Sequence, residues 1–562
     1  MKTNRKHRNK IMRIGTATLV TLSLLITRVA YIAIFESERL MAAAESLHER
    51  ERAIKAARGR VISSDGVVLA DNKTVCTVSV VHSQITDAER VISVLTEELE
   101  MDEAKVRKYV EKVSSMEKVK TNVDKETGDR IRAYELDGVK VDEDSKRVYP
   151  YATLASKVLG FTGADNQGIV GLEVEYESIL KGNDGMILTL TDAEGVELDE
   201  YEETRVEPEA GKDLYLSLDY TIQSYATQAA KKAYEANQAK SVSIIIMNPN
   251  NGEILAMVNY PEYDLNDPFV VEDMDELNAI WRNTITNDTY EPGSIFKTVT
   301  ATAALETGAV TLENSYTCGG RIAVADRSIS CHKTTGHGTQ TFRETLMNSC
   351  NPAFVTWGLR TGKDNFLSYM DKLGLMSKTG IDLPGEASTI MHDVEAIKEL
   401  DLAVMSFGQS FQITPLQMMR AVSAIINGGT LVTPHFCVKT IDAEGNITEL
   451  EYEETSGVIE KQTSETMKSL MLDVVAEGGG KRCYIEGYSI GGKTATSQKL
   501  PRGNGKYVAS FIGFAPADNP EVIAMCLIDE PSGIYYGGTI AAPVICEIFQ
   551  NIFPYLGIEK GT

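Results

Sequence analysis

The chain has 562 residues, too many for one hydrophobic core, so two or three folded units are expected. Its hydrophobic fraction of 43% and charged fraction of 24% are typical of folded protein and exclude long disordered tracts. The formal net charge of -24 excludes a basic nucleic-acid footprint over the whole chain, so no nucleic-acid partner is expected.

A basic segment followed by an apolar one opens the chain. Five of the first ten residues are Lys or Arg, and the apolar run Ile14 to Phe35 contains Arg28 as its only charge. As a helix this run spans about 33 Å, enough to cross a membrane. We expect a cytoplasmic tail at 1–10, one transmembrane helix at 11–35 and an extracytoplasmic remainder, giving a single-pass cell-membrane protein. A cleaved signal peptide is the alternative, although Ala42 to Ala44 lie well beyond the apolar run.

Residues 36–210 combine several patterns and no concentration of catalytic residue types. Residues 36–57 predict a charged helix that continues out of the membrane, and residues 60–72 predict strands with a turn at Asp65-Gly66. Residues 86–120 predict helices with scattered charge, and after a glycine-rich stretch at 147–176 alternating strands are expected to about residue 218. We therefore expect 36–210 to be an elongated, non-catalytic module.

Residues 211–562 predict an α+β domain, because strand patterns at both ends enclose a mostly helical stretch at 294–430. A helix at 221–239 precedes two apolar strands that join at Asn251-Gly252, a strong hairpin signal. Near the end, three more strands precede a long apolar helix at 541–553. The strands of both ends are expected to form one antiparallel sheet packed on helices.

Ser294 is the first candidate catalytic residue. Pro292-Gly293 breaks the chain just before it, and a predicted helix follows, so Lys297 shares a helix face with Ser294. A serine hydroxyl needs a base to become a nucleophile, and a lysine with a lowered pKa can be that base. The Ser-x-x-Lys pattern alone identifies nothing, because it also begins at Ser115, Ser178 and Ser330.

Two further polar motifs follow in the chain. Ser349-Cys350-Asn351 is the only Ser-x-Asn, and its hydroxyl and amide can relay a proton and hydrogen-bond a substrate. Gly491 to Thr496 (GGKTAT) lies on a predicted strand, where Lys493 supplies positive charge and Thr494 a hydroxyl. A literal Lys-Thr-Gly at 378–380 is rejected, because it is predicted to lie in a loop.

The order Ser-x-x-Lys, Ser-x-Asn, Lys-Thr resembles that of class B penicillin-binding proteins, and the resemblance covers nearly all of the chain. Other segments carry it too: Arg58-Gly59, Gly168 to Glu173, Tyr290 to Ser294, Phe407 to Gln409, Thr414 to Gln417, Asn427 to Gly429 and Tyr536 to Gly538. The resemblance implies a membrane-anchored peptidoglycan D,D-transpeptidase that forms a serine acyl-enzyme, releases a terminal D-Ala and is a penicillin target. The implied ligands are D-Ala-D-Ala stem peptides and β-lactams, and the implied partners are a membrane glycosyltransferase and divisome-type proteins.

The resemblance also implies residue roles, with no metal and no cofactor. Ser294 is the expected nucleophile and Lys297 its base, with Ser349 as proton relay. Asn351 is expected to hold the donor's amide, Thr494 to bind its terminal carboxylate and Lys493 to tune the local potential. Gly492 and Ala495 lie beside Lys493 and Thr494 on the same predicted strand. The backbone N–H groups of Ser294 and Thr496 are the expected oxyanion hole. Ala495 departs from the family, which usually has Gly there; we expect activity to survive.

Eight cysteines are present without a CxxC pair. Cys331 and Cys350 resemble those of the sporulation-specific branch of the family, which makes a redox-active disulfide between them one hypothesis. Small buried thiols are the other interpretation. Cys331-His332 and His337 lack the usual zinc spacing and are interpreted as loop residues.

Three other functions remain as alternatives. A β-lactamase or carboxypeptidase could use the same fold, and a catalytically silent scaffold for cell-wall assembly would explain Ala495. A glycosyltransferase is the third, although residues 36–210 contain no recognisable motif for it. A role in septation, elongation or spore formation stays open, as do the acceptor amine and the oligomeric state.

Overall fold

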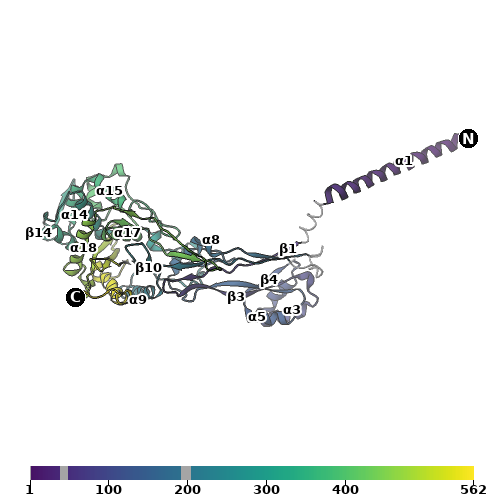
Figure 1. The fold of residues 1–562 in the computed structure, drawn as a ribbon, viewed down its shortest axis with the longest axis horizontal. Helices are drawn as coiled ribbons and strands as arrows, with labels where there is room; N and C mark the ends of the chain where they lie inside the picture. The colour runs from purple at the N-terminus through teal and green to yellow at the C-terminus, as the bar shows by residue number, and fades with distance from the viewer. Residues whose placement is uncertain (1, 38, 40–48, 115, 191–203, 562) are drawn as a thin grey trace. The chain divides into compact units, whose positions relative to one another are not determined.

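The computed structural model describes residues 2–37, 39, 49–114, 116–190 and 204–561 (Figure 1). These residues form two compact units. The first contains the described residues up to 57 together with 73–146 and 183–209, and the second contains 58–72, 147–182 and 210 onward. Two stretches of the segment 36–210 therefore pack with the C-terminal part of the chain.

The N-terminal helix α1 (Lys2–Tyr31) continues into a π-helical turn, η1 (Ile32–Glu36) (Figure 1). Two helical stretches of the described chain, His7–Glu36 and Gly537–Leu556, are long and apolar enough to cross a membrane. The side chains of the first are exposed, whereas the second packs in the core of the second unit. His7–Glu36 thus fits the predicted membrane anchor.

The predicted charged helix at 36–57 is wrong over its last part. Residues 49–54 form strand β1 (Glu49–Ile54), which pairs antiparallel with β6 (Gly185–Leu190) and so belongs to a sheet completed by β7 (Thr204–Val206). Backbone pairing with a distant strand has overridden local helix propensity. Residues 40–48 of that prediction lie outside the described residues.

The core of the first unit packs helices on a strand pair. Helices α3 (Ala88–Leu99), α4 (Glu103–Val110) and α5 (Lys125–Ala133) cover β4 (Glu117–Asp124) and the second half of β3 (Val68–Val80). The helices expected at 86–120 are confirmed for α3 and α4, but the chain becomes a strand at Glu117. The alternation of buried and exposed residues in β4 is weak, because only Val119 and Val123 of this strand are buried.

The second unit is built on a five-stranded antiparallel sheet in the order β10-β9-β21-β20-β19, which confirms the sheet predicted from both ends of the domain. Its strands are β9 (Ser241–Met247), β10 (Ile254–Tyr260), β19 (Gly491–Gln498), β20 (Tyr507–Ala515) and β21 (Val522–Asp529). The predicted Asn-Gly turn joins β9 to β10, with Gly252 at φ +87°. Strand β19 lies at an edge of the sheet.

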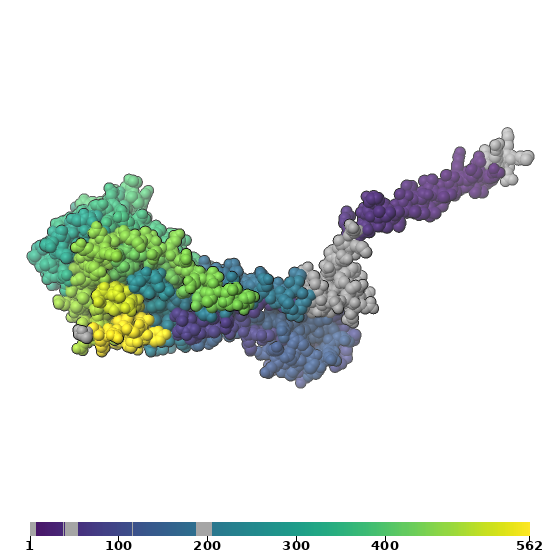
Figure 2. Space-filling model, in the orientation of Figure 1, coloured from purple at the N-terminus to yellow at the C-terminus, as the bar shows by residue number. Residues whose placement is uncertain are grey.

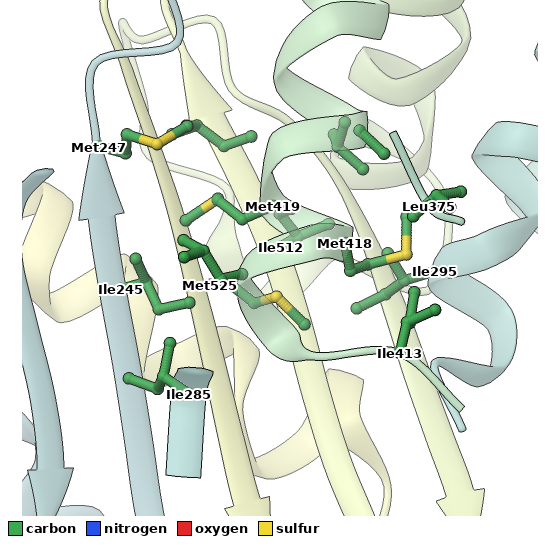
Figure 3. Packing of buried hydrophobic residues seen from close by; sticks show 14 of the residues in the cluster. Ile245, Met247, Ile285, Ile295, Leu375, Ile413, Met418, Met419, Ile512 and Met525 are labelled. Atoms are coloured by element: carbon green, nitrogen blue, oxygen red, sulfur yellow. The ribbon is translucent and has the colours of Figure 1, made fainter. Parts of the chain in front are cut away.

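Helices cover both faces of this sheet. Helices α9 (Tyr220–Asn237) and α20 (Ala542–Leu556) cover one face and contact each other, linked by the Lys232–Glu547 ion pair. The C-terminal segment that contains α20 is exposed at the surface as the yellow atoms of Figure 2. On the other face, Met418 and Met419 of α17 (Pro415–Ile426) pack over the strands (Figure 3).

One row of residues crosses the sheet on that second face. Ile245, Met525 and Ile512 are direct cross-strand neighbours, and the next neighbour of Ile512 is Lys493 of β19. The first three lie in the apolar cluster shown in Figure 3. Lys493 therefore continues a hydrophobic row, which explains why its side chain is fully buried.

The stretch 294–430 is mostly helical as predicted, but it contains two short hairpins that were not. Strand β11 (Ser315–Cys318) pairs with β14 (Gly338–Thr341), and β12 (Arg321–Val324) pairs with β13 (Arg327–Ser330). The helices of this stretch are α12 (Lys297–Glu306), α13 (Phe342–Met347), α14 (Asn351–Thr361), α15 (Lys363–Lys372), α16 (Glu399–Met405) and α17.

The remaining elements of the second unit are short, except for α18 (Lys461–Ala476). The helices are α6 (Ser156–Leu159), α7 (Gly171–Glu175), α8 (Glu177–Leu180), α10 (Met274–Trp281), α11 (Thr284–Asn287) and α19 (Gly537–Ile540). The strands are β2 (Val61–Ile62), β8 (Asp213–Leu216), β15 (Thr430–Leu431), β16 (Cys437–Ile441), β17 (Ile447–Glu449) and β18 (Thr455–Ser456). Strand β5 (Val139–Val148), most of which belongs to the first unit, pairs with β3.

Candidate active site

Ser294 lies in a 3₁₀ turn, η3 (Gly293–Phe296), that leads directly into α12. Gly293 has φ +56°, and a Cβ there would lie 2.3 Å from the Ser497 Oγ of β19. Its N–H donates to the carbonyl of Gly408 at 2.9 Å. The predicted Pro-Gly break therefore presses this turn against β19 and the 407–409 loop, leaving Ser294 half-buried.

The Lys297 amine lies in the centre of the site. It donates to the Ser349 carbonyl at 2.6 Å, to the Ser349 Oγ at 3.1 Å and to the Asn351 Oδ1 at 2.7 Å. The side chain is fully buried, with Nζ 5.5 Å from the centre of the Phe354 ring. Burial lowers the pKa of Lys297 to about 7. A large fraction of this amine is therefore neutral at pH 7 and able to accept a proton.

Ser349 connects the two lysines of the site. It lies between α13 and α14 with φ +50°, a conformation uncommon for any residue except glycine. Its Oγ also accepts a hydrogen bond from the Lys493 Nζ at 3.2 Å. Burial first, and then the charge of Lys297, holds the pKa of Lys493 well below its ordinary value. The three predicted motifs thus meet at one hydroxyl group.

Strand β19 forms one wall of the site. Lys493 and Ala495 are buried on the face toward η3, while Thr494 and Thr496 are half-buried on the opposite face. The Thr496 Oγ1 accepts a hydrogen bond from the Gly537 N–H at 3.1 Å. Among the described strands, β19 pairs only with β20 in this sheet, so its other edge has no strand partner.

Glycines allow other backbone segments to approach β19 closely. A Cβ on Gly492 would lie 2.6 Å from the Ile512 carbonyl oxygen, and one on Gly537 would lie 2.2 Å from that of Ala495. The strand tolerates a methyl group at Ala495, where the side chain is 3% exposed. The structure therefore brings Gly492 and Ala495 into the same strand as the predicted binding residues, as the sequence indicated.

The competing motifs lie elsewhere. Lys378 to Gly380 form a loop in which the Thr379 hydroxyl donates to Glu386 at 2.6 Å. Ser178 lies in α8 and Ser330 ends β13, whereas Ser115 lies outside the described residues. Among the described Ser-x-x-Lys motifs, the one at Ser294 is therefore the one whose lysine contacts Ser349.

A second cluster adjoins the site and was missed by the sequence interpretation. Cys318, Cys331, His337 and Cys350 place one ligand atom each within 4.8 Å of one another, an arrangement that could hold a metal ion. Short hairpins separate these residues in the chain, and only their unpredicted pairing brings them together. Cys331 and Cys350 are both free thiols in this structure, so the hypothesis of a disulfide between them stays a prediction.

Family models match most of the chain. The penicillin binding protein transpeptidase domain matches residues 242–552, and the penicillin-binding protein dimerisation domain matches residues 53–216.

Curated relatives match over similar lengths. The stage V sporulation protein D of Bacillus subtilis is 37% identical, covering 95% of this chain and 83% of the relative. A probable peptidoglycan D,D-transpeptidase PenA of Neisseria gonorrhoeae is 29% identical, covering 97% of this chain and 92% of the relative.

Solved structures show the same fold. A peptidoglycan synthetase of Bifidobacterium adolescentis aligns with a TM-score of 0.76 at 21% identity, covering 92% of this chain and 98% of that one. Penicillin-binding protein 3 of Mycobacterium tuberculosis, solved with aztreonam, aligns with a TM-score of 0.70 at 23% identity. The alignment covers 91% of this chain and 98% of that one.

Proposed function

Because this chain belongs to the penicillin-binding protein transpeptidase family, we propose that it is a serine peptidoglycan D,D-transpeptidase acylated by β-lactams. One observation carries the assignment of residues: the buried Lys297 amine, three residues after Ser294, contacts both Ser349 and Asn351. A neutral amine in that position is the base that a serine nucleophile requires.

The proposed reaction has two acyl-transfer steps. Ser294 Oγ attacks the carbonyl of the penultimate D-Ala of a stem peptide while Lys297 accepts its proton. Ser349 then passes a proton to the amine of the terminal D-Ala, which leaves as the ester to Ser294 forms. An amine of a second stem peptide attacks this ester, forms the cross-link and restores the Ser294 hydroxyl.

The donor peptide would bind along the free edge of β19. Thr494 would hydrogen-bond its terminal carboxylate, and Asn351 its amide. The backbone N–H groups of Ser294 and Thr496 would stabilise the oxyanion. Lys493 would tune the local electrostatic potential at Ser349, to whose Oγ its amine donates at 3.2 Å.

We further propose a location and a division of labour along the chain. The basic residues 1–10 would stay in the cytoplasm and the helix at 11–35 would cross the membrane, leaving the catalytic domain outside. Residues 36–210 would form a pedestal or dimerisation module for the transpeptidase domain at 211–562. The exposed apolar side chains of α1 offer a docking surface to a membrane glycosyltransferase or divisome-type partner.

The test is acylation of the full-length, detergent-solubilised chain by a fluorescent penicillin. We expect a long-lived adduct that is lost in Ser294→Ala and retained in Ser178→Ala, which alters the serine of another Ser-x-x-Lys motif. An adduct that persists in Ser294→Ala would refute the nucleophile. Rapid turnover of penicillin would favour a β-lactamase, and the absence of any adduct would favour a scaffold.

A further inference from the structure

Four potential metal ligands converge beside the Ser-x-Asn motif. Cys318 ends β11, Cys331 follows β13, His337 precedes β14, and Cys350 is the N-cap residue of α14. Cys318 pairs directly with Gly338, so the antiparallel pairing of β11 and β14 places Cys318 close to His337. The N–H of Cys331 donates to the Gly320 carbonyl at 2.8 Å, which holds the second hairpin against the first.

The distances fit one small cation. All four ligand atoms lie within 4.8 Å of one another, and the Cys331 Sγ lies 3.6 Å from the His337 Nδ1. In tetrahedral zinc sites, Zn–S bonds of about 2.3 Å and Zn–N bonds of about 2.0–2.1 Å place neighbouring ligand atoms roughly 3.5–3.8 Å apart. Small side-chain rotations would bring this cluster to that geometry.

The composition of the cluster favours a metal over a disulfide. A disulfide between Cys331 and Cys350 would use two of the sulfur atoms and leave the convergence of Cys318 and His337 unexplained. The three cysteines are at most 2% exposed, whereas His337 is half-buried and leaves a route of entry for an ion. Thiolates and imidazole are the ligands that zinc prefers.

We propose that Cys318, Cys331, His337 and Cys350 bind one divalent, thiolate-preferring cation of the Zn²⁺ class. Three thiolates and the His337 Nδ1 complete four-coordination, so the ion has a structural role and no open position for substrate. His332, whose Nδ1 lies 3.9 Å from the Cys331 Sγ, stands next to the site as an outer contact.

The ion would also position the catalytic residues. Cys350 lies between Ser349 and Asn351 in the chain, and the Asn351 Nδ2 donates to the Ser330 carbonyl at 3.3 Å, next to Cys331. A bound ion therefore ties both hairpins to the segment that presents the Ser349 hydroxyl in its left-handed conformation. The metal site stands apart from the proposed function, and only this positioning effect rests on it.

The primary test is metal content and spectroscopy of the full-length chain purified under reducing conditions with Zn²⁺ supplied. We expect about one zinc per chain, reduced several-fold in Cys318→Ser and His337→Ala and unchanged in Cys546→Ser, a cysteine outside the cluster. Replacement by Co²⁺ in the wild-type chain should produce thiolate-to-cobalt charge transfer and the intense d–d bands of a tetrahedral site. This spectrum tests the site even if a variant fails to fold.

Two results would overturn the metal site. One is a wild-type chain without stoichiometric zinc and without the cobalt spectrum. The other is a Cys331–Cys350 disulfide found by mass spectrometry in chain isolated without reductant, together with failure to bind zinc after reduction.

Penicillin acylation separates the metal site from the proposed function. Removal of the ion by a chelator should slow acylation about 10- to 100-fold, as expected when a catalytic group is misplaced, and Zn²⁺ should restore it. An unchanged rate in metal-free protein would refute the positioning effect. Zinc-loaded protein that never reacts with penicillin would refute the proposed function and leave the metal site intact.

Discussion

The second unit buries two pairs of cationic side chains and surrounds them differently. Arg58 and Arg147 share the carboxylate of Glu173, at 2.6 and 2.7 Å, with at most 2% exposure. Lys297 and Lys493 are also fully buried, but among the described residues neither lies within ion-pair distance of a carboxylate. A buried cation with an acidic partner keeps its charge and holds structure, whereas one without a partner tends to become neutral.

The paired cations join two segments of the chain. Arg147 also donates to the Gly59 carbonyl at 2.8 Å, and the Tyr149 hydroxyl donates to Glu173 at 3.2 Å. These contacts connect residues 58–72 to residues 147–182. The hydrogen bonds of the unpaired lysines go to hydroxyl, carbonyl and amide oxygens, so their protons can move. The same physical event, burial of a cation, thus yields a structural element in one place and a candidate base in the other.

The largest loss of acylation rate should come from replacing the unpaired Lys297 with a cation that cannot lose its proton. Lys297→Arg keeps the charge but removes the base, because the guanidinium stays protonated. We expect the rate of acylation by penicillin to fall by about 10²- to 10⁴-fold, the usual contribution of general base catalysis. Stopped-flow measurement with a fluorescent penicillin would provide the rate.

Lys378→Arg is the matched control, since Lys378 is an exposed residue of the rejected Lys-Thr-Gly loop. It should acylate at the wild-type rate. If Lys297→Arg also reacts at the wild-type rate, Lys297 is not the base. The buried lysines and the buried arginines would then not differ in the way argued above.

The next largest effect is a loss of stability when the paired arginines lose their shared carboxylate. Glu173→Gln would leave Arg58 and Arg147 buried without their shared carboxylate, which should lower the free energy of unfolding by about 3–5 kcal/mol. Both Trp residues of the chain, Trp281 and Trp357, lie in the second unit, so denaturant titration followed by Trp fluorescence reports on this unit.

Glu177→Gln provides a graded comparison. Glu177 also pairs with Arg58, at 2.7 Å, but its side chain is 30% exposed, so we expect a loss of about 1 kcal/mol or less. Equal losses of unfolding free energy in Glu173→Gln and Glu177→Gln would mean that burial of a carboxylate does not determine how much it stabilises the protein.

A smaller effect should appear in the pH dependence of acylation. Because burial lowers the pKa of Lys297 to about 7, the neutral amine increases from about one-tenth of the molecules at pH 6 to about nine-tenths at pH 8. The acylation rate should therefore rise with pH by about tenfold over this range and then level off. A flat profile, or a midpoint near the ordinary lysine value, would show that burial does not neutralise Lys297.

The three motifs and the central sheet could be predicted because their signals are local. Apolar runs mark β9, β10, β20 and β21, the GGKTAT motif marks β19, and the Asn-Gly turn marks the first hairpin. The burial of Lys297 and Lys493 could not be predicted from the motifs. It depends on Phe354, which is three residues after Asn351, and on the apolar row that ends at Lys493.

The short strands could not be predicted for the opposite reason: their partners are distant or their pattern is absent. Strand β1 pairs with β6 across more than a hundred residues, and its charged residues favour a helix. Strands β11 to β14 have four residues each, too few to establish a period. The cluster of Cys318, Cys331, His337 and Cys350 depends on these hairpins, so the sequence predicts only loop residues at Cys331 and His337.

The smallest effect should come from a change in packing that leaves the charges alone. Ala495 lies on the same buried face of β19 as Lys493, and its Cβ would lie 3.6 Å from a Cβ placed on Gly293. Ala495→Gly restores the residue usual in the family and removes one methyl group beside the turn that carries Ser294. We expect acylation rates to change by less than about tenfold, because one methyl group in a pocket contributes roughly 1 kcal/mol. Rates for penicillins and cephalosporins would be compared in wild type and variant, and a gain from zero activity would show that Ala495 silences the site and that the scaffold alternative is correct.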